Sequence, residues 1–224
     1  EIMLTLGIDD SGRGPVIGPM VLAGCVIIVD IEKELKNLGV KDSKQLTPKR
    51  REFLANIIKD KAETFEIVIV HASEIDETSN SGTNLNQIEA IKMAEVINKV
   101  NKGFTKIRVI VDCPSTNITA WTDYLKTKFN NLSNLEISCE HKADVNHVSV
   151  SAASILAKST REEEMNKLKL KYGGDIGSGY ASDPATCRFL EKYAKKYQEE
   201  GIFRQTWATW RNAISVQAQR KLEF

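Results

Sequence analysis

The spacing of apolar residues near the start of the chain predicts two neighbouring strands. Residues Met3 to Asp9 alternate roughly between apolar and polar side chains, and Met20 to Val29 form a continuous apolar run. A turn rich in glycine and proline, Ser11 to Pro19, separates the two segments. Alternation and short apolar runs between turn residues are typical of strands. We therefore expect both segments to lie side by side in one sheet.

The remaining pattern predicts helices and strands in turn. Thr47 and Pro48 suit the N-cap and the first position of a helix. Apolar residues recur at every third position from Ile88 to Ile97, which indicates a second helix. Further strands are expected at residues 65–70, 106–111 and 135–139, and further helices at 121–129, 148–172, 184–200 and 205–222. Because strands that are joined through a helix usually pair in parallel, we expect part of the sheet to be parallel.

This order of elements predicts an α/β domain followed by a helical extension. We assign residues 1–170 to the α/β domain and residues 171–224 to the extension. Of the 224 residues 42% are hydrophobic and 27% are charged, so the chain can bury a core of ordinary size. We find no internal repeat and no low-complexity tract.

Charge and cysteine content narrow the possible function classes. Lys and Arg (31) nearly balance Asp and Glu (30), so any basic surface that binds nucleic acid must be local. The cysteines fit no CxxC or zinc-finger spacing, which indicates free thiols in a reducing compartment. No apolar run reaches the ~18 residues of a membrane span, and no segment has the pattern of a signal peptide. We therefore expect a cytoplasmic protein that does not contact a membrane.

Four aspartates stand close to the ends of predicted elements. Asp9 and Asp10 follow an apolar strand, Asp112 ends another, and Asp144 shortly precedes the helix that begins at Val148. The carboxyl ends of neighbouring parallel strands form one crevice, so these side chains can converge. Converging carboxylates repel one another unless a cation neutralises them, and hard divalent cations such as Mg2+ prefer such oxygens. Two such ions about 4 Å apart can promote displacement at a phosphodiester.

Each aspartate taken alone also has a plain structural explanation. An aspartate after a strand commonly closes a turn or caps a helix, and Asp144 can stabilise the dipole of the helix that follows it. Asp9 and Asp10 would point to opposite faces of an ideal strand, so both reach one site only if the chain turns there. Gly12 and Gly14 permit such a turn.

The segment Gly7 to Gly14 has the glycine spacing of a nucleotide-binding phosphate loop but lacks the loop's key side chains. Arg13 occupies the position of the lysine, and Gly14 occupies that of the Ser or Thr hydroxyl. A nucleotide triphosphatase is therefore an alternative that the pattern disfavours. A Gly-Arg-Gly turn still suits a polymeric ligand, because glycine permits close backbone approach and arginine offers planar donors to phosphate. A plain turn between strands is the other explanation.

Five segments together resemble the ribonuclease HII family, in particular its archaeal type, from Gly7 to about Pro184. The first and the fourth are long and specific. The segments are GIDDSGRGPVIGP (Gly7 to Pro19), DSKQLT (Asp42 to Thr47), VIVD (Val109 to Asp112), KADVNHVSVSAASILAK (Lys142 to Lys158) and GSGYASDP (Gly177 to Pro184). The resemblance implies a ribonuclease H-like α/β fold, with a mixed sheet flanked by helices and a C-terminal helical extension.

The resemblance also implies the activity and the residues that carry it. The enzyme would be an endonuclease of DNA replication and repair that cuts the RNA strand of RNA/DNA hybrids and the 5' side of ribonucleotides embedded in duplex DNA. It would leave a 3'-hydroxyl and a 5'-phosphate. The implied catalytic and metal-binding residues, which hold two Mg2+ or Mn2+ ions, are Asp9, Asp10, Asp112 and Asp144.

Eight further residues are implied to bind the substrate. Three hold the backbone at the junction of RNA and DNA, one aromatic ring stacks there and senses the 2'-hydroxyl, and four contact phosphates. In that order they are Gly12, Arg13 and Gly14; Tyr180; and Ser43, Lys44, Lys142 and Lys158. Because the 2'-hydroxyl distinguishes RNA from DNA, such contacts select the cleavage position without reading bases.

One departure from the family pattern affects the proposed metal site. The second acid of the family is normally Glu, whereas this chain has Asp10, which is shorter by about 1.5 Å, a displacement that can cost about a hundredfold in rate. Either the local backbone compensates, or the activity is reduced or shifted toward Mn2+. A second departure, Ser11 in place of the usual Ala, is tolerable.

The C-terminal residues suggest a partner for an enzyme that we otherwise expect to be a monomer. Gln219, Leu222 and Phe224 resemble a truncated sliding-clamp binding motif, in which a Gln and spaced apolar residues occupy a groove. A frayed helix end is the alternative. Three rival functions remain open: a hybrid-binding module without catalysis, a nucleotide hydrolase and a clamp-recruited scaffold.

Overall fold

The computed structural model describes residues 3–41 and 43–222, with side chains up to residue 220. The chain divides into two compact units, each built from several segments of the sequence. The first unit comprises Glu1–Ser11, Val21–Val68 and Leu85–Thr160, and the second comprises Gly12–Met20, Ile69–Asn84 and Arg161–Phe224. The division into residues 1–170 and 171–224 remains a prediction.

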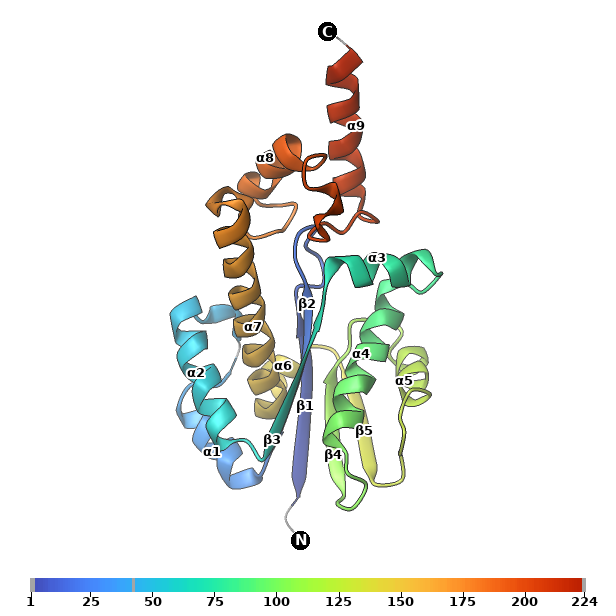
Figure 1. Cartoon of the computed structure of the whole chain (residues 1–224). Coiled ribbons are helices and arrows are strands. Elements are labelled where there is room, and N and C mark those ends of the chain that lie inside the picture. The colour runs from blue at the N-terminus through green and yellow to red at the C-terminus, as the bar shows by residue number, and fades with distance from the viewer. Residues whose placement is uncertain (1–2, 42, 223–224) are drawn as a thin grey trace. The chain divides into compact units, whose positions relative to one another are not determined.

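A mixed five-stranded sheet forms the centre of the first unit (Figure 1). Its strands, in spatial order, are β3 (Thr64–Val70), β2 (Met20–Ile27), β1 (Leu4–Ser11), β4 (Ile107–Asp112) and β5 (Leu135–Glu140). β1 pairs antiparallel with β2 and parallel with β4, and β4 pairs parallel with β5. The expected neighbouring strands and the expected parallel pairing are therefore confirmed.

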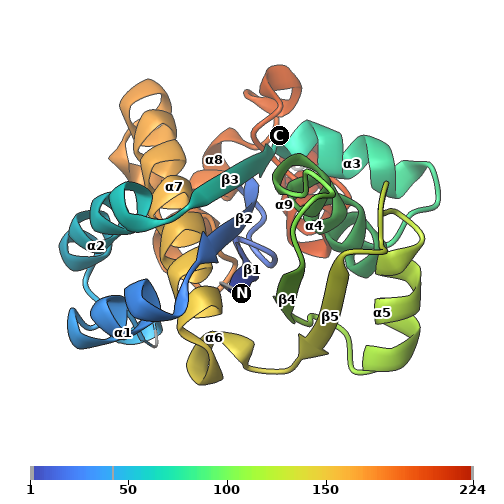
Figure 2. The same cartoon turned by 90° about the horizontal axis from the view of Figure 1, so that it is seen from below.

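Helices cover both faces of this sheet, which confirms the predicted α/β class. Figure 2 shows α2 and the first half of α7 on one side of the strands, and α4 and α5 on the other. The helices of this unit are α1 (Val29–Asn37), α2 (Pro48–Lys61), α4 (Leu85–Val100), α5 (Ile118–Lys126), α6 (Ala143–Asn146) and the start of α7 (Val148–Tyr172), with a short 3-10 helix at Ser43–Gln45.

The sequence prediction was right about the start of α2 and missed three other helices, α1, α3 (Ala72–Asn80) and the four-residue α6. The Thr47 hydroxyl accepts a hydrogen bond from the Arg50 amide, and Pro48 is the first residue of the helix. α1 was missed because only its first residue, Val29, belongs to the apolar run and only its Leu35 is buried. α3 was missed because it is mostly polar and buries only Ala72 and Ile75.

Gly7 in β1 allows the first turn of α7 to pack directly on the sheet. A Cβ atom at this position would lie 2.1 Å from the carbonyl carbon of Ser149 and 2.3 Å from the amide nitrogen of Val150. Both are backbone atoms, so neither can move aside by a change of rotamer. This close approach positions α6 and α7 beside the ends of β1 and β4.

We expect Gly7→Ala to destabilise the protein by about 3 kcal/mol or more, because a well-packed interior does not accommodate added atoms without backbone shifts. Thermal or urea unfolding measures the change. Gly174→Ala is the matched control, since a Cβ at Gly174 would meet nothing within 4 Å. Equal stability of the Gly7 and Gly174 variants would show that the helix does not press on the strand.

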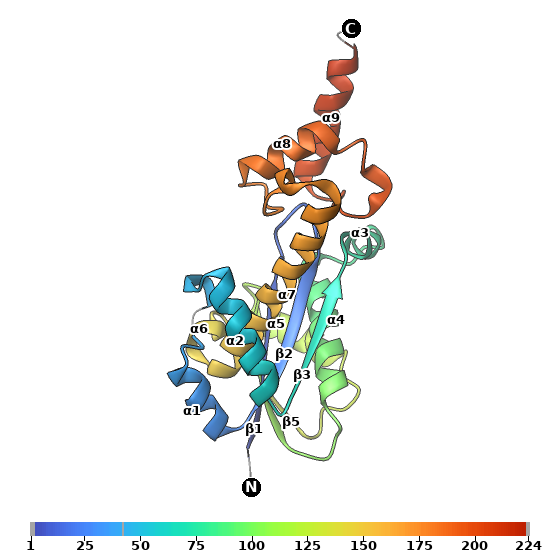
Figure 3. The same cartoon turned by 60° about the vertical axis from the view of Figure 1, so that its left-hand side comes forward.

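The core of the second unit is an apolar cluster to which α8 (Pro184–Tyr193) and α9 (Ala208–Leu222) contribute. Figure 3 shows these two helices side by side. The buried members of the cluster are Val16, Ile17, Ile176, Phe189, Leu190, Ala194, Ile202, Phe203 and Trp210. α8 is shorter than predicted and is followed by a 3-10 turn at Gln198–Glu200, and α9 begins three residues later than predicted.

None of the described helices combines the length and the apolar composition that crossing a bilayer requires. The four cysteines are free thiols. Cys25 and Cys113 are buried, and burial raises the pKa of the Cys25 thiol to about 12. Such a thiol is protonated at neutral pH and unreactive.

Candidate active site

Asp9 and Asp112 lie at equivalent positions on two neighbouring parallel strands. The pairing of β1 with β4 runs as far as Ile8 and Val111, and each aspartate is the next residue of its strand. Equivalent residues of paired strands point to the same face of a sheet, so the two carboxylates lie on one face. Asp9 is buried and Asp112 is half-buried. The convergence expected from the sequence holds for this pair.

Asp144 is brought to the same place by the turn between β5 and α6. The Ala143 amide donates a hydrogen bond of 2.7 Å to Oδ1 of Asp112, so the residue before Asp144 is fixed against the end of β4. Lys142 adopts a left-handed backbone conformation, with φ of 55°, at this turn. A small buried cluster of Ile110, Ala143 and Val150 holds α6 and α7 on β4. Asp144 itself is buried.

The carboxylates of the cluster raise one another's pKa values. Burial raises the pKa of Asp9 well above its usual value, and repulsion from Asp10 and Asp112 raises it further. Burial also raises the pKa of Asp112, and the charge of Asp144 adds to this effect. Asp10 is half-buried, and its amide donates a hydrogen bond of 2.7 Å to Oδ1 of Asp9. The turn expected after Asp9 is not present, because β1 continues through Asp10 to Ser11. The four carboxylates are nevertheless linked electrostatically, Asp10 and Asp112 acting on Asp9 and Asp144 on Asp112.

The donor atoms of this acid cluster (Asp9, Asp10, Asp112 and Asp144) suit a hard divalent cation, because such ions prefer carboxylate oxygens. Among the residues that the structure describes, no three His, Cys, Asp or Glu side chains form a ready-made ligand shell. Like charges that lie close together are stabilised when a cation binds between them. The residues thus fit a divalent ion in chemistry and charge.

Behind Asp9 a chain of hydrogen bonds leads through two buried serines to a lysine. The Ser154 hydroxyl bonds to Asp9, and it lies 2.8 Å from the hydroxyl of Ser43. Lys158 donates to the Ser43 hydroxyl at 2.5 Å. Ser43 is fully buried, and its hydroxyl is already hydrogen-bonded to Ser154 and Lys158. The phosphate contact expected of Ser43 remains a prediction. Asp42, which precedes it, lies outside the described residues.

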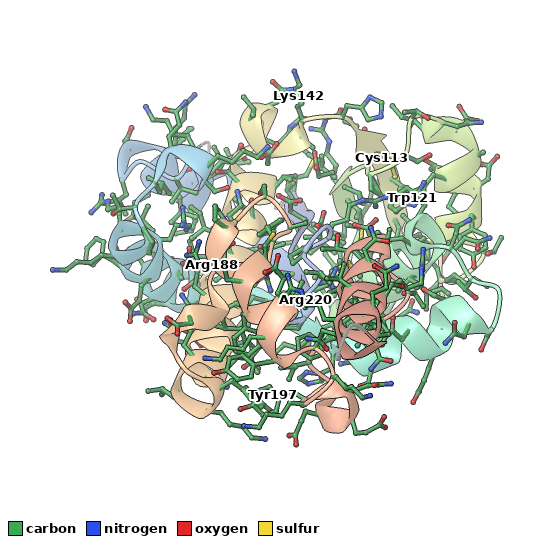
Figure 4. All side chains as sticks on the ribbon, turned by 90° about the horizontal axis from the view of Figure 1, so that it is seen from above. Cys113, Trp121, Lys142, Arg188, Tyr197 and Arg220 are labelled. Carbon is green, nitrogen blue, oxygen red and sulfur yellow. The ribbon has the colours of Figure 1, made fainter. Side chains whose placement is uncertain are left out.

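Lys44 and Lys142 are exposed residues of the first unit that lie close to the acid cluster. The Lys44 ammonium is 3.7 Å from Oδ2 of Asp144, but its side chain is 71% exposed, so this ion pair contributes little stability. Lys142 lies at the turn before α6 (Figure 4). Both are placed where a phosphate could reach them, and their contacts with substrate remain predictions.

The second unit brings together the other group of predicted residues, Gly12, Arg13, Gly14 and Tyr180. Gly12 has a φ of +80°, and a Cβ there would lie 2.5 Å from the Arg161 side chain, so glycine is required. A Cβ at Gly14 would lie 3.8 Å from the Tyr180 ring, which places this ring beside the loop. The carbonyl of Gly179 accepts hydrogen bonds from the amides of Val16 (2.9 Å) and Ile17 (3.2 Å).

Arg161 of α7 supports this arrangement and was not predicted from the sequence. It is buried, and its guanidinium donates to the carbonyls of Pro19 and Ser178, both at 3.0 Å. The same guanidinium lies 5.5 Å from the centre of the Tyr180 ring. Ser154 was missed as well, because one serine among several in a helix of small residues has no distinguishing signal.

Comparison with known proteins identifies the family. The sequence pattern described as Ribonuclease HII matches residues 6–210. The chain belongs to the ribonuclease HII family. The ribonuclease HII of Methanocaldococcus jannaschii is 42% identical over 98% of this chain and 99% of its own length. The family that the sequence motifs suggested is thus confirmed.

Solved structures agree with this assignment and with the predicted ribonuclease H-like fold. The ribonuclease H2 of Pyrococcus horikoshii superposes with a TM-score of 0.85 at 38% identity, covering 98% of this chain and 99% of that one. A ribonuclease HII of Archaeoglobus fulgidus, solved in a complex with PCNA, gives a TM-score of 0.79 at 36% identity, covering 93% and 96%. The chain is therefore an enzyme of the ribonuclease H type 2 class, whose family implies endonuclease activity on the RNA of RNA/DNA hybrids and dependence on divalent metal ions.

Proposed function

We propose that this enzyme hydrolyses the phosphodiester on the 5' side of a ribonucleotide, both in RNA/DNA hybrids and at single ribonucleotides embedded in duplex DNA. The products are a 3'-hydroxyl and a 5'-phosphate. The observation that carries the proposal is the acid cluster. Burial raises the pKa of Asp9, and Asp10 and Asp112 raise it further; burial also raises the pKa of Asp112, to which Asp144 adds. Carboxylates held in this way are suited to binding cations beside a scissile phosphate.

In this proposal Asp9, Asp10, Asp112 and Asp144 hold two divalent ions, Mg2+ or Mn2+. In such sites divalent ions supply activation of the attacking water and stabilisation of the departing oxygen. The protein's own part is to fix the carboxylates. The Ala143 amide orients Asp112, and the Ser154 hydroxyl and the Asp10 amide orient Asp9. Reorientation during the reaction is thereby kept small.

Recognition of the substrate is assigned to the residues grouped in the second unit and to the basic residues near the acids. Gly12, Arg13 and Gly14 hold the sugar-phosphate backbone, and the exposed Tyr180 ring stacks against the sugar that carries the 2'-hydroxyl. The amines of Lys44, Lys142 and Lys158 attract neighbouring phosphates, as basic side chains do in nucleic-acid complexes. Burial lowers the pKa of Lys158, whereas the nearby charge of Asp9 raises it.

The test is cleavage mapping on three end-labelled duplexes of one sequence: all DNA, DNA with a single ribonucleotide, and an RNA/DNA hybrid. We expect cuts 5' of each ribonucleotide with Mg2+ or Mn2+, no cut in all-DNA duplex, and no product in EDTA. Products with ligatable 3'-hydroxyl and 5'-phosphate ends would support the stated polarity. Binding of the hybrid without any metal-dependent nicking would favour the rival, a binding module without catalysis.

We also propose that the C-terminal residues bind a sliding clamp, since a relative in the same family was solved with PCNA. Gln219 is exposed on α9, whereas the Leu222 side chain and Phe224 lie outside the described residues. Deleting residues 220–224 should abolish co-elution with a PCNA-type clamp and leave cleavage of the single-ribonucleotide duplex unchanged. Co-elution of the truncated enzyme would place the contact elsewhere.

A further inference from the structure

Arg204 is hydrogen-bonded to several carbonyls of the loop Gly12–Gly18. Neither the sequence motifs nor the proposed function gives this residue a role. Its side chain is fully buried in the second unit. The guanidinium donates to the carbonyls of Gly12 at 2.5 Å and Arg13 at 2.6 Å, and its Nε donates to the carbonyl of Gly18 at 3.2 Å. The Arg204 amide donates to the carbonyl of Val16 at 2.8 Å. Arg204 is therefore hydrogen-bonded to both ends of the loop and to its middle.

Trp207 extends this support by one residue. Its indole Nε1 donates to the carbonyl of Gly14 at 3.1 Å. The Arg204 guanidinium lies 5.0 Å from the centre of the Trp207 ring, so the two side chains pack on each other. Three consecutive carbonyls, those of Gly12, Arg13 and Gly14, are thus bonded to this pair of side chains.

This bonding fixes where the amides of the loop point. In a planar trans peptide the carbonyl and the following N–H lie on opposite sides, and no described peptide bond is cis. The carbonyls of Gly12 and Arg13 face Arg204, so the N–H groups of Arg13 and Gly14 point away from it. Successive N–H groups presented by a glycine turn form a concave surface that binds anions.

The charge behind the loop favours the same kind of ligand. Burial, followed by repulsion from Arg161, lowers the pKa of Arg204 to about 9, so its guanidinium remains cationic at neutral pH. Within the described residues, neither Arg204 nor Arg161 forms an ion pair with a carboxylate, and both donate mainly to backbone carbonyls. Two buried positive charges therefore lie close to the loop, and the charge of Asp76 and the Tyr180 side chain offset the cost of burying them only in part.

We propose that Arg204 and Trp207 are positioning residues that preset the Gly12–Gly14 loop as a phosphate-binding surface. The inference rests on the proposed function, because the phosphate is that of the ribonucleotide-containing duplex. The pair does not touch the reacting atoms. Its loss should therefore weaken binding of the duplex while leaving the rate at saturating substrate nearly unchanged.

Two tryptophan variants isolate the key hydrogen bond. Trp207→Phe keeps a ring beside Arg204 and removes the N–H that bonds to Gly14. Trp210→Phe is the matched control, because the Trp210 indole N–H has no hydrogen-bond partner among the described residues. We expect the Kd for the single-ribonucleotide duplex, measured by fluorescence anisotropy in EDTA, to rise about fivefold for Trp207→Phe, as expected for loss of one hydrogen bond. The control should bind like the wild type even if its core position lowers Tm.

Arg204→Lys provides a second, stronger variant, since it keeps the charge but cannot span several carbonyls. We expect its KM to rise about 30-fold or more, with kcat within about twofold of the wild type, as for loss of two to three hydrogen bonds used equally in ground and transition states. If this variant does not fold, the comparison of Trp207→Phe with Trp210→Phe still tests the positioning role.

The outcomes separate this role from the proposed function. Wild-type binding of the duplex together with an unchanged Kd in Trp207→Phe would overturn the positioning role alone. A fall in kcat without a change in Kd or KM would also overturn it, because it would place the pair in the chemical step. A wild-type enzyme that neither binds nor cuts the duplex would remove the proposed function and this role with it.

Discussion

Replacing Asp9 with Asn should lower the cleavage rate on the single-ribonucleotide duplex by about a thousandfold or more. Stabilisation of a phosphodiester transition state by metal ions amounts to several kcal/mol, and each 1.36 kcal/mol is a factor of ten in rate. Asp9 is more buried than Asp10, the other acid on β1, and it is repelled by both Asp10 and Asp112. Loss of its charge should therefore weaken the cation site more than loss of a peripheral ligand.

A readout that does not depend on activity separates this effect from misfolding. In EDTA the Asn variant should be at least as stable as the wild type, because it removes a buried carboxylate whose raised pKa reports a poor environment for charge. Addition of Mn2+ should raise the Tm of the wild type and much less that of Asp9→Asn. Asp123→Asn, an exposed position on α5, is the control and should behave like the wild type in both assays. Wild-type cleavage by Asp9→Asn would exclude the mechanism.

The parts of the site that could be predicted from the sequence are those marked by local pattern. Asp112 ends β4 and Asp9 follows the apolar part of β1, and the parallel pairing of these strands makes the convergence of the two side chains a matter of geometry. The glycine at position 12 was likewise detectable, because glycine clusters mark turns with positive φ. Both patterns can be detected from neighbouring residues in the sequence, without knowing which distant segments are in contact.

The residues that escaped prediction depend on contacts between distant segments. Arg204 looks like an ordinary charged residue before a helix, yet it is buried against the carbonyl of Arg13, 191 residues earlier in the chain. Ser154 gains its place from Ser43, 111 residues away. Similarly, the strand was predicted to run to Val29, whereas β2 ends at Ile27 and α1 begins at Val29, because an apolar run does not show where a strand ends and a helix starts.

Lengthening Asp10 to Glu should increase the Mg2+-supported rate, by as much as about a hundredfold. The family pattern has Glu at this position, and the shorter side chain withdraws the carboxylate by about one carbon-carbon bond, a misplacement of the size that can cost that factor. Asp10 is half-buried at the end of β1 and contributes to the raised pKa of Asp9. A longer side chain would bring its charge further toward the shared site. The rate with Mn2+ should rise less, so the Mn2+/Mg2+ rate ratio should fall.

The matched control for this change is Asp112→Glu, which lengthens a second acid of the same cluster. Oδ1 of Asp112 accepts the Ala143 amide at 2.7 Å, so an added methylene displaces a carboxylate that is already fixed, and activity should fall. Opposite responses of the two variants, measured as kcat with each metal on the single-ribonucleotide duplex, would support a specific deficit at Asp10. An unchanged or lower Mg2+ rate for Asp10→Glu would mean that the backbone at the end of β1 already compensates for the shorter aspartate.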